Sequence, residues 1–268
     1  MTTVAEQALQ LSGIEKHYGY VRALNDVDFD VNFGEVVCLL GDNGAGKSTL
    51  LKVMSGAHRV TRGEIRVAGK PVRFNSPHDA AAAGIQMVYQ DLALVEALDI
   101  ATNLQLGREP MQRFPLNLFG FIDRRAMHRN SIEQLDKLGV RTAPPTRAVE
   151  MLSGGQRQVV AIARAAVRVM EGGSRGIILM DEPTAALGYE QTQMVQGLIR
   201  RMADQGIAIV LVTHNLPLCF SVSDRIVVMN RGRKVADVRK DETDKDSIVG
   251  WITGAKAEQT FGIKNDAV

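Results

Sequence analysis

The segment from residue 41 to residue 49 has the residue types and spacing of a loop that binds phosphate. It reads Gly-Asp-Asn-Gly-Ala-Gly-Lys-Ser-Thr and fits the pattern G-x-x-x-x-G-K-[ST]. In that pattern the glycines let backbone N–H groups close around phosphates, the lysine reaches the β- and γ-phosphates, and the following hydroxyl binds Mg²⁺. We therefore expect a nucleotide to contact Gly41, Asp42, Asn43, Gly44, Ala45, Gly46, Lys47, Ser48 and Thr49.

The neighbouring segments place this loop between a strand and a helix. Residues 36–40 are almost wholly apolar, as in a buried parallel strand. After the loop, apolar residues recur at helical spacing from Lys47 to Met54, and Gly56 ends the pattern. Phosphate would thus lie at a helix N-terminus, where free N–H groups attract anions. The alternative is a glycine-rich turn that matches by chance, and the strand–loop–helix order argues against it.

Two adjacent carboxylates follow another buried strand. Residues 177–180 are apolar, and Asp181 and Glu182 come directly after them. At the carboxyl end of a strand the first carboxylate can hold Mg²⁺, and the second can accept a proton from an attacking water. The alternative is that the pair caps the next helix, but Pro183 and Thr184 follow without an immediate helical pattern. We therefore expect the two carboxylates to have separate chemical roles.

Two more strand ends carry polar side chains that could reach a nucleotide. Gln90 follows the expected strand at 84–89, and His214 follows the buried strand at 207–212. Ligands in open α/β sheets bind beyond the carboxyl ends of the strands, so Gln90 is placed to meet the nucleotide and its metal. The imidazole of His214 could donate to a γ-phosphate. A surface glutamine is the alternative for Gln90, and we expect solvated side chains at His17, His58, His78 and His128.

A short Ser-Gly-Gly-Gln segment and one tyrosine complete the candidate residues. Ser153, Gly154, Gly155 and Gln156 open an amphipathic helical pattern, so a hydroxyl and free backbone N–H groups are available to an anion. Tyr18 lies upstream of the phosphate loop, where its ring could stack on an adenine base. A place in the core is the alternative for this tyrosine.

Length and composition are those of a globular chain with a substantial core. The chain has 268 residues, and 45% of them are hydrophobic. The net charge is +2 with acids and bases interspersed, so the sequence has no strong nucleic-acid footprint and we expect no nucleic-acid partner, although the charge alone does not exclude one. No apolar run approaches the roughly 20 residues of a membrane helix. The first residues lack a signal-peptide pattern, so we expect a cytoplasmic protein. Cys38 and Cys219 lie in apolar surroundings, and we expect buried, reduced thiols.

The remaining segments indicate β-rich parts and a helical middle. Residues 27–33 alternate strictly, which predicts a half-exposed strand, and a glycine-bounded strand at 63–69 indicates an antiparallel β-layer beside a parallel core. Residues 91–152 suggest helices separated by breakers, which predicts an inserted helical subdomain. The polar tail from Gly254 is expected to be loose. Helices are expected from the cap Asp99 to about Leu106, from the cap Asp123 to Gly139, from Tyr189 to Ala203 and from Thr243 to Trp251.

Taken together, these motifs resemble those of the ATP-binding cassette (ABC) ATPases, over nearly the whole chain. They occur in the family's sequence order: the phosphate loop, Gln90, the Leu-Ser-Gly-Gly-Gln segment at 152–156, the strand and carboxylates at 177–182, and His214. The resemblance implies an α/β fold, a P-loop NTPase with a RecA-like parallel sheet core, an antiparallel β-layer and an inserted helical subdomain. The nucleotide-binding domain would span residues 8–252, with the helical subdomain at about 92–158 and a C-terminal tail at 253–268.

The resemblance also implies ATP and Mg²⁺ as ligands. Tyr18 would stack on adenine, and Lys47 with neighbouring amides would hold the β- and γ-phosphates. Ser48 and Gln90 would bind Mg²⁺, with support from Asp181.

Hydrolysis and dimerisation involve a second set of residues in the family. Glu182 would be the general base, and His214 would contact the γ-phosphate. Family members act as head-to-tail dimers with two nucleotides at the interface. The segment of Ser153, Gly154, Gly155 and Gln156 would therefore bind ATP held by a second copy of the chain.

One position departs from the family's pattern. After the general base the family usually has Ser-Ala-Leu-Asp, whereas this chain has Ala-Ala-Leu-Gly at 185–188. The carboxylate that crosses the dimer interface is therefore missing at Gly188. This difference affects how hydrolysis at the two sites is coupled, while the phosphate, metal and base positions are unchanged.

Finer resemblance at residues 87–94, 103–109 and 184–188 points to the importer branch that serves ribose, xylose, galactose or fructose. The chain has one cassette, like the fructose-importer subunits, which implies a homodimer. Residues after Gln90 would contact integral-membrane permease subunits, and a periplasmic binding protein would deliver the sugar. The protein would lie on the cytoplasmic face of the inner membrane. The alternatives are transport of another solute, a soluble ABC protein acting on ribosomes or DNA, and a binding module without turnover.

Overall fold

The computed structural model describes residues 6–114, 116–140, 142–171, 175–185 and 187–256. The expectations for the first five residues and for most of the polar tail therefore fall outside the described residues. The strands are β1 (Gln7–Tyr18), β2 (Val21–Asn32), β3 (Val36–Gly41), β4 (Arg62–Val67), β5 (Lys70–Val72), β6 (Ile85–Val88), β7 (Ile177–Asp181), β8 (Ala208–Val212), β9 (Arg225–Asn230) and β10 (Arg233–Arg239). The α-helices are α1 (Lys47–Met54), α2 (Pro77–Ala82), α3 (Ile100–Gln105), α4 (Arg124–Lys137), α5 (Gly154–Glu171), α6 (Tyr189–Asp204), α7 (Leu216–Val222) and α8 (Lys245–Thr253). Short 3-10 helices lie at Leu116–Phe119, Val149–Met151 and Lys240–Glu242.

The core is a six-stranded sheet in the order β10-β9-β3-β8-β7-β6. β9, β3, β8, β7 and β6 run parallel, and β10 at one edge is antiparallel to β9. All residues of β3 and β8 are buried, which explains their continuous apolar runs, because both faces of the sheet are covered. The expected parallel core is confirmed. The phosphate loop follows β3, which lies inside this sheet between β9 and β8.

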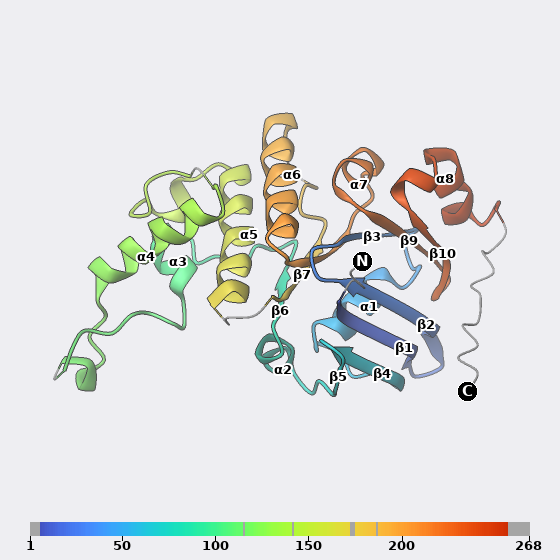
Figure 1. Ribbon diagram of the computed structural model, residues 1–268, viewed down its shortest axis with the longest axis horizontal. Coiled ribbons are helices and arrows are strands. Elements are labelled where there is room, and N and C mark those ends of the chain that lie inside the picture. The colour runs from blue at the N-terminus through green and yellow to red at the C-terminus, as the bar shows by residue number, and fades with distance from the viewer. Residues whose placement is uncertain (1–5, 115, 141, 172–174, 186, 257–268) are drawn as a thin grey trace, which may run out of the picture.

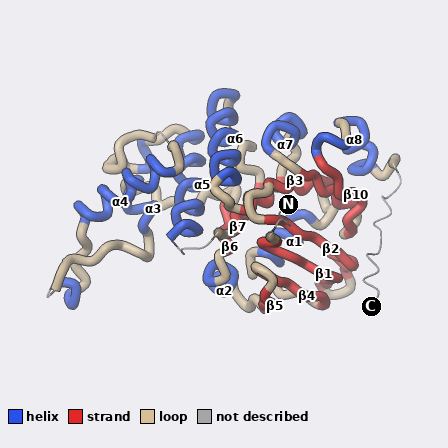
Figure 2. The backbone as a smooth tube through the Cα atoms, in the orientation of Figure 1, coloured by secondary structure: helices blue, strands red, loops and turns tan. Residues whose placement is uncertain are grey.

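A four-stranded antiparallel sheet, in the order β2-β1-β4-β5, lies on one side of this core (Figure 1). Val27, Phe29 and Val31 of β2 are buried and alternate with more exposed residues, as the sequence pattern predicted. These side chains join α1 and one face of β3 in a single apolar cluster. The expected antiparallel β-layer is therefore confirmed, and Figure 2 shows both sheets in red.

Helices cover the other face of the core sheet. α5, α6, α7 and α8 contribute to one apolar cluster with the opposite face of β3, including Cys38 (Figure 1). Cys38 and Cys219 are both buried and free, as expected. Burial raises the pKa of the Cys38 thiol, and the neighbouring Cys219 acts in the same direction.

The middle of the chain is helical and extends away from the sheets at the end opposite α8 (Figure 1). α3 and α4 are capped as predicted, because Asp99 accepts the backbone N–H of Thr102 at 2.7 Å and Asp123 accepts that of Ala126 at 2.9 Å. Two short helices, α2 and α7, were not predicted, since six or seven residues are too few for a clear period. Within the part of the chain that is described, no helix is long and apolar enough to cross a membrane.

Candidate active site

The phosphate loop joins β3 to α1, and two of its glycines explain its shape. Gly41 has a φ of 149° and Gly46 a φ of 102°, conformations that other residues rarely adopt. A side chain on Gly41 would run into the carbonyl of Met229 in β9, and one on Gly46 would lie 2.9 Å from the carbonyl of Ala23 in β2. The loop is therefore packed closely between elements of both sheets.

Lys47 begins α1 with its ammonium directed back into the loop. Nζ donates to the carbonyls of Gly41 at 2.8 Å and Asp42 at 2.9 Å. Burial lowers the pKa of Lys47, whereas Glu182, Asp42 and Asp181 act in the opposite direction. A buried cation beside the backbone of this loop is suited to receive phosphate oxygens.

The two carboxylates lie where β7 ends. Burial raises the pKa of Asp181, and the positive charges of Lys47, Lys52 and His214 partly offset that effect. Glu182 has a φ of 49°, a left-handed conformation that is strained for this residue type. The pair does not cap a helix, because α6 begins only after Gly188.

The two carboxylate oxygens of Glu182 differ in their hydrogen bonding. The hydroxyl of Thr213 donates to Oε2 at 3.3 Å. Oε1 is buried and makes no hydrogen bond, although Nε2 of His214 lies 3.3 Å away without the required alignment. Gln90, Glu182 and His214 all line one cavity of about 740 Å³, so the structure brings together three of the predicted site residues.

Three of the predicted site residues carry donor atoms that fit Mg²⁺. Ser48 supplies a hydroxyl in the first turn of α1, Gln90 an amide oxygen and Asp181 a carboxylate, and Mg²⁺ prefers oxygen ligands of this kind. No group of three or more His, Cys, Asp or Glu side chains suited to a metal occurs among the described residues. A magnesium ion here would therefore depend on hydroxyl, amide and phosphate oxygens as well as on one carboxylate.

Tyr18 ends β1 and is 42% exposed, which leaves ring surface open to a base. The ring of His58 meets it edge-on with centroids 5.5 Å apart, and the ammonium of Lys16 lies 5.0 Å from its centroid. The expectation of a solvated His58 is wrong, because the turn after α1 folds onto β1. Burial, with Lys16 and Lys52, lowers the pKa of His58.

Two more histidines expected to be solvated are also engaged. Nε2 of His17 is buried and lies 3.2 Å from Oε2 of Glu15. Nε2 of His128 in α4 lies 3.2 Å from Oδ2 of Asp99, the cap of α3. Both side chains are partly buried, so the contact links the two helices.

The Ser-Gly-Gly-Gln segment forms the N-terminus of α5, as predicted. The hydroxyl of Ser153 accepts the backbone N–H of Gln156 at 3.3 Å, and Oε1 of Gln156 accepts that of Ser153 at 3.0 Å. None of Ser153, Gly154, Gly155 and Gln156 lines the cavity that contains the general-base candidate. The structure thus separates this segment from that cavity.

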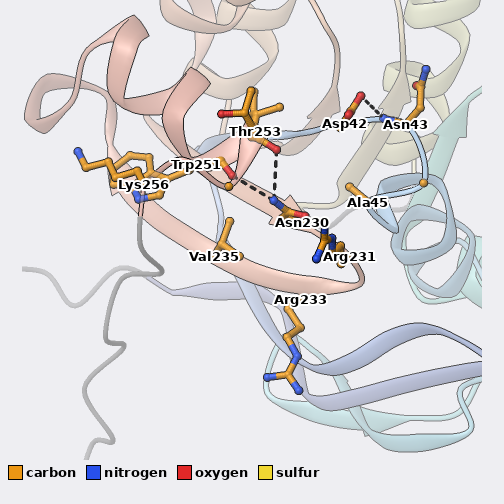
Figure 3. A pocket seen from close by; sticks show the side chains of 13 residues that line it. Asp42, Asn43, Ala45, Asn230, Arg231, Arg233, Val235, Trp251, Thr253 and Lys256 are labelled. Carbon is orange, nitrogen blue, oxygen red and sulfur yellow. Dashed lines mark hydrogen bonds between the residues drawn. The ribbon is translucent and has the colours of Figure 1, made fainter.

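The first half of the phosphate loop faces a different cavity of about 720 Å³ (Figure 3). Its other walls are the turn between β9 and β10 and the end of α8. Asn230 holds these walls together, because its amide donates to the carbonyls of Trp251 at 3.4 Å and Ile252 at 3.2 Å. Asp42, Asn43 and Gly44 are exposed on this side of the loop, whereas Ala45 lines the cavity but is buried.

Three residues of interest were not identified from the sequence. Thr213 directly precedes His214, and its position at a strand end was the available signal. No such signal marked the contacts of His58 with Tyr18 and of Gln191 with Gly155, because each pair lies more than thirty positions apart in the chain.

Comparison with known proteins agrees with this geometry. Residues 24–185 match the sequence model of the ABC transporter family. The chain is 45% identical to the fructose import ATP-binding protein FrcA of Rhizobium meliloti, over 94% of this chain and 95% of that protein. It is 42% identical to the xylose/arabinose import ATP-binding protein XylG of Sulfolobus acidocaldarius, over 91% and 93% of the two chains.

A solved structure has the same fold. The ADP conformation of MJ1267, an ATP-binding cassette of an ABC transporter, superposes with a TM-score of 0.75 at 26% identity, over 92% of this chain and 95% of that one. The fold, the phosphate loop and the sequence likeness lead to one conclusion: the chain belongs to the ABC transporter family and is an ATP-binding cassette ATPase with the P-loop NTPase fold.

Proposed function

We propose that the protein hydrolyses ATP to drive uptake of a monosaccharide through a membrane permease. The main support is sequence likeness along nearly the full length of two proteins named for the import of fructose and of xylose or arabinose. Fructose and pentoses are therefore the first sugars to test. In this role the protein would lie on the cytoplasmic face of the inner membrane, receive sugar indirectly from a periplasmic binding protein and have no nucleic-acid partner.

Hydrolysis would use the residues gathered at the strand ends. Lys47 and the loop amides hold the phosphates, and Tyr18 stacks on the base. Oε1 of Glu182, which receives no hydrogen bond from the protein, accepts a proton from the attacking water, while Thr213 fixes the other oxygen. Mg²⁺ held by Ser48, Gln90 and Asp181 would neutralise charge on the phosphates.

His214 and the segment at 153–156 would act on the γ-phosphate from opposite sides. His214 lies beside Glu182 in the same chain. The segment at 153–156 does not line that cavity, so we assign it to the ATP of a second copy in a head-to-tail homodimer. A site completed only in the dimer makes ATP binding favour closure, and hydrolysis then releases it.

A groove beside Gln90 is a suitable place for a permease helix. This cavity, of about 410 Å³, is lined by the end of β6, the loop after Gln90, α2 and α5. The guanidinium of Arg164 in α5 donates to the carbonyls of Ala93 at 2.7 Å and Leu92 at 2.9 Å. Arg168 donates to the carbonyl of Leu106 at 3.0 Å. A permease helix in this groove would thus push on the loop after Gln90 and on α5 together.

Uptake of labelled fructose, xylose, arabinose and ribose by cells lacking the gene tests the proposal. Complementation with wild type should restore uptake of one sugar, and K47A should not, since it lacks the phosphate-binding ammonium. K70A removes an exposed lysine of β5 and serves as the matched control. Normal entry of every sugar in the deletion strain would overturn the sugar assignment and leave an ATPase that serves another solute or acts outside transport.

A further inference from the structure

Gln191, in the first turn of α6, contacts two glycines that lie far apart in the sequence. Its Oε1 accepts the backbone N–H of Gly188 at 2.7 Å. Its aliphatic stem fills the space in front of Gly155, which is buried. A Cβ added to Gly155 would overlap Cγ of Gln191 and lie 2.7 Å from its Cβ.

The contact with Gly188 is the principal side-chain restraint at that turn. Gly188 is the N-cap of α6 and has no side chain, so it cannot accept the backbone N–H groups of the first turn as Ser or Asp would. Only the reverse half of a capping box exists here, and Gln191 supplies it. Gly188 has no side chain that could contact a partner subunit, so any movement at this position is passed on through its backbone. Gln191 holds that backbone by the hydrogen bond to its N–H.

The contact with Gly155 is steric and acts over a very short range. The Gln191 stem occupies the place that a Cβ of Gly155 would take, so no space remains between them, and a shift of the α5 N-terminus towards α6 displaces this stem. The same side chain then carries the displacement to the N–H of Gly188. One residue thus joins the segment at 153–156 to the turn before α6.

We propose that Gln191 is a positioning residue that makes these two segments respond as one unit to the nucleotide of the partner subunit. This inference rests on the head-to-tail homodimer proposed above, in which the segment at 153–156 faces that nucleotide and the turn before α6 lies at the dimer interface. Gln191 itself touches no nucleotide in this scheme. Its loss should weaken dimer closure and cooperativity, while ATP binding to the single subunit stays unchanged.

Three substitutions separate the two contacts. Q191M keeps an unbranched stem against Gly155 and loses the acceptor, and Q191A loses both. Q191E keeps the stem and the acceptor, and a carboxylate is favourable at a helix N-terminus. Q193A is the matched control, because Gln193 is the same residue type on the same helix and is exposed.

The readouts are the Hill coefficient and kcat for ATP hydrolysis and, in the E182Q background, the dimer Kd in ATP by analytical ultracentrifugation. We expect Q191A to raise the dimer Kd by about tenfold, the effect of losing one ordinary hydrogen bond, and to lower the Hill coefficient towards one. Q191M should fall between Q191A and wild type, and Q191E should restore wild-type values. Binding of a fluorescent ATP analogue to the monomer should be the same in all variants.

A double-mutant cycle tests the steric contact separately. G155A alone should impair closure, because its methyl group collides with Gln191, and G155A combined with Q191A should recover part of that loss. Wild-type closure and cooperativity in Q191A and Q191M, or an equal loss in Q193A, would overturn the inference alone. A wild-type protein that never dimerises with ATP would overturn the proposed dimer and this inference together.

Discussion

Thr213 donates its hydroxyl hydrogen to Oε2 of Glu182 across 3.3 Å, and Thr213 is completely buried. The other carboxylate oxygen, Oε1, is buried without a hydrogen bond. The protein thus donates a hydrogen bond to one carboxylate oxygen and leaves the other without a donor. A carboxylate fixed in this way can present a single, oriented proton acceptor.

Replacing Thr213 by Val should therefore slow hydrolysis without weakening ATP binding. Val has the same shape but cannot donate to Glu182, so the base would lose its orientation. We expect kcat to fall by about tenfold, with KM for ATP unchanged, because the bond acts on the base and not on the nucleotide. T213S keeps the hydroxyl and should behave as wild type. Equal kcat values for T213V and T213S would show that the contact does not position the base.

The edge-on contact between His58 and Tyr18 predicts an effect on ATP affinity. Y18A should raise KM for ATP by about tenfold, since stacking on a base contributes roughly 1–3 kcal/mol. H58A should raise KM by a smaller factor, because it leaves the tyrosine in place without its support. Neither change should alter kcat much. H128A removes a histidine from the distant α4 and is the control for H58A. An unchanged KM in Y18A would exclude adenine stacking at this position.

The ion pairs of Arg225 should contribute strongly to the free energy of unfolding. Its side chain is 16% exposed and contacts three carboxylates. The guanidinium lies 3.1 Å from Asp30, 2.8 Å from Glu35 and 2.9 Å from Asp237. Burial alone would lower the pKa of Arg225, and these carboxylates raise it above its ordinary value. R225M would remove the cation from the buried carboxylate of Glu35, while Asp237 keeps its contact with Lys234 at 2.9 Å, so we expect a loss of about 3 kcal/mol in the free energy of unfolding.

Denaturant unfolding of a second variant provides the comparison for R225M. Arg239 pairs with Asp241 on the surface, with side chains 65% and 69% exposed. R239M should therefore change the free energy of unfolding by less than about 1 kcal/mol. Similar losses in the two variants would mean that burial does not distinguish these ion pairs.

The raised pKa of Asp181 predicts a stability cost that depends on pH. The folded protein binds this proton more tightly than the unfolded chain, so the ionised carboxylate destabilises the nucleotide-free fold above the raised pKa. The cost disappears as the pH falls below the unfolded pKa, where both states are protonated. D181N should raise the melting temperature at pH 8, and the gain should shrink towards pH 4.5. D136N, at an exposed position of α4, should show no such trend. A gain that is constant with pH would have another cause.

Local sequence determines much of this fold and little of its long-range contacts. The buried runs before Gly41 and Asp181 were recognisable as parallel strands, and the caps Asp99 and Asp123 fixed two helix starts. These features depend on neighbouring residues, so a single sequence shows them.

The residues that were missed depend on tertiary contacts. His58 meets Tyr18 only because the turn after α1 packs on β1, forty positions away in the chain. Gln191 meets Gly155 because α6 packs beside α5, and no pattern in either helix marks that pair. Side chains that act through packing carry no motif, whereas those that touch phosphate must match a fixed chemistry.

The hydrogen bonds from α5 to the neighbouring loops have a consequence for the evolution of such proteins. Arg164 and Arg168 bind main-chain carbonyls at positions 92, 93 and 106, and every amino acid carries that carbonyl. These hydrogen bonds therefore do not depend on which side chains stand at positions 92, 93 and 106. In the permease complex proposed above, these side chains can be replaced to suit a different permease while the two arginines keep the same hydrogen bonds, so the choice of partner and the transmission of movement can evolve separately.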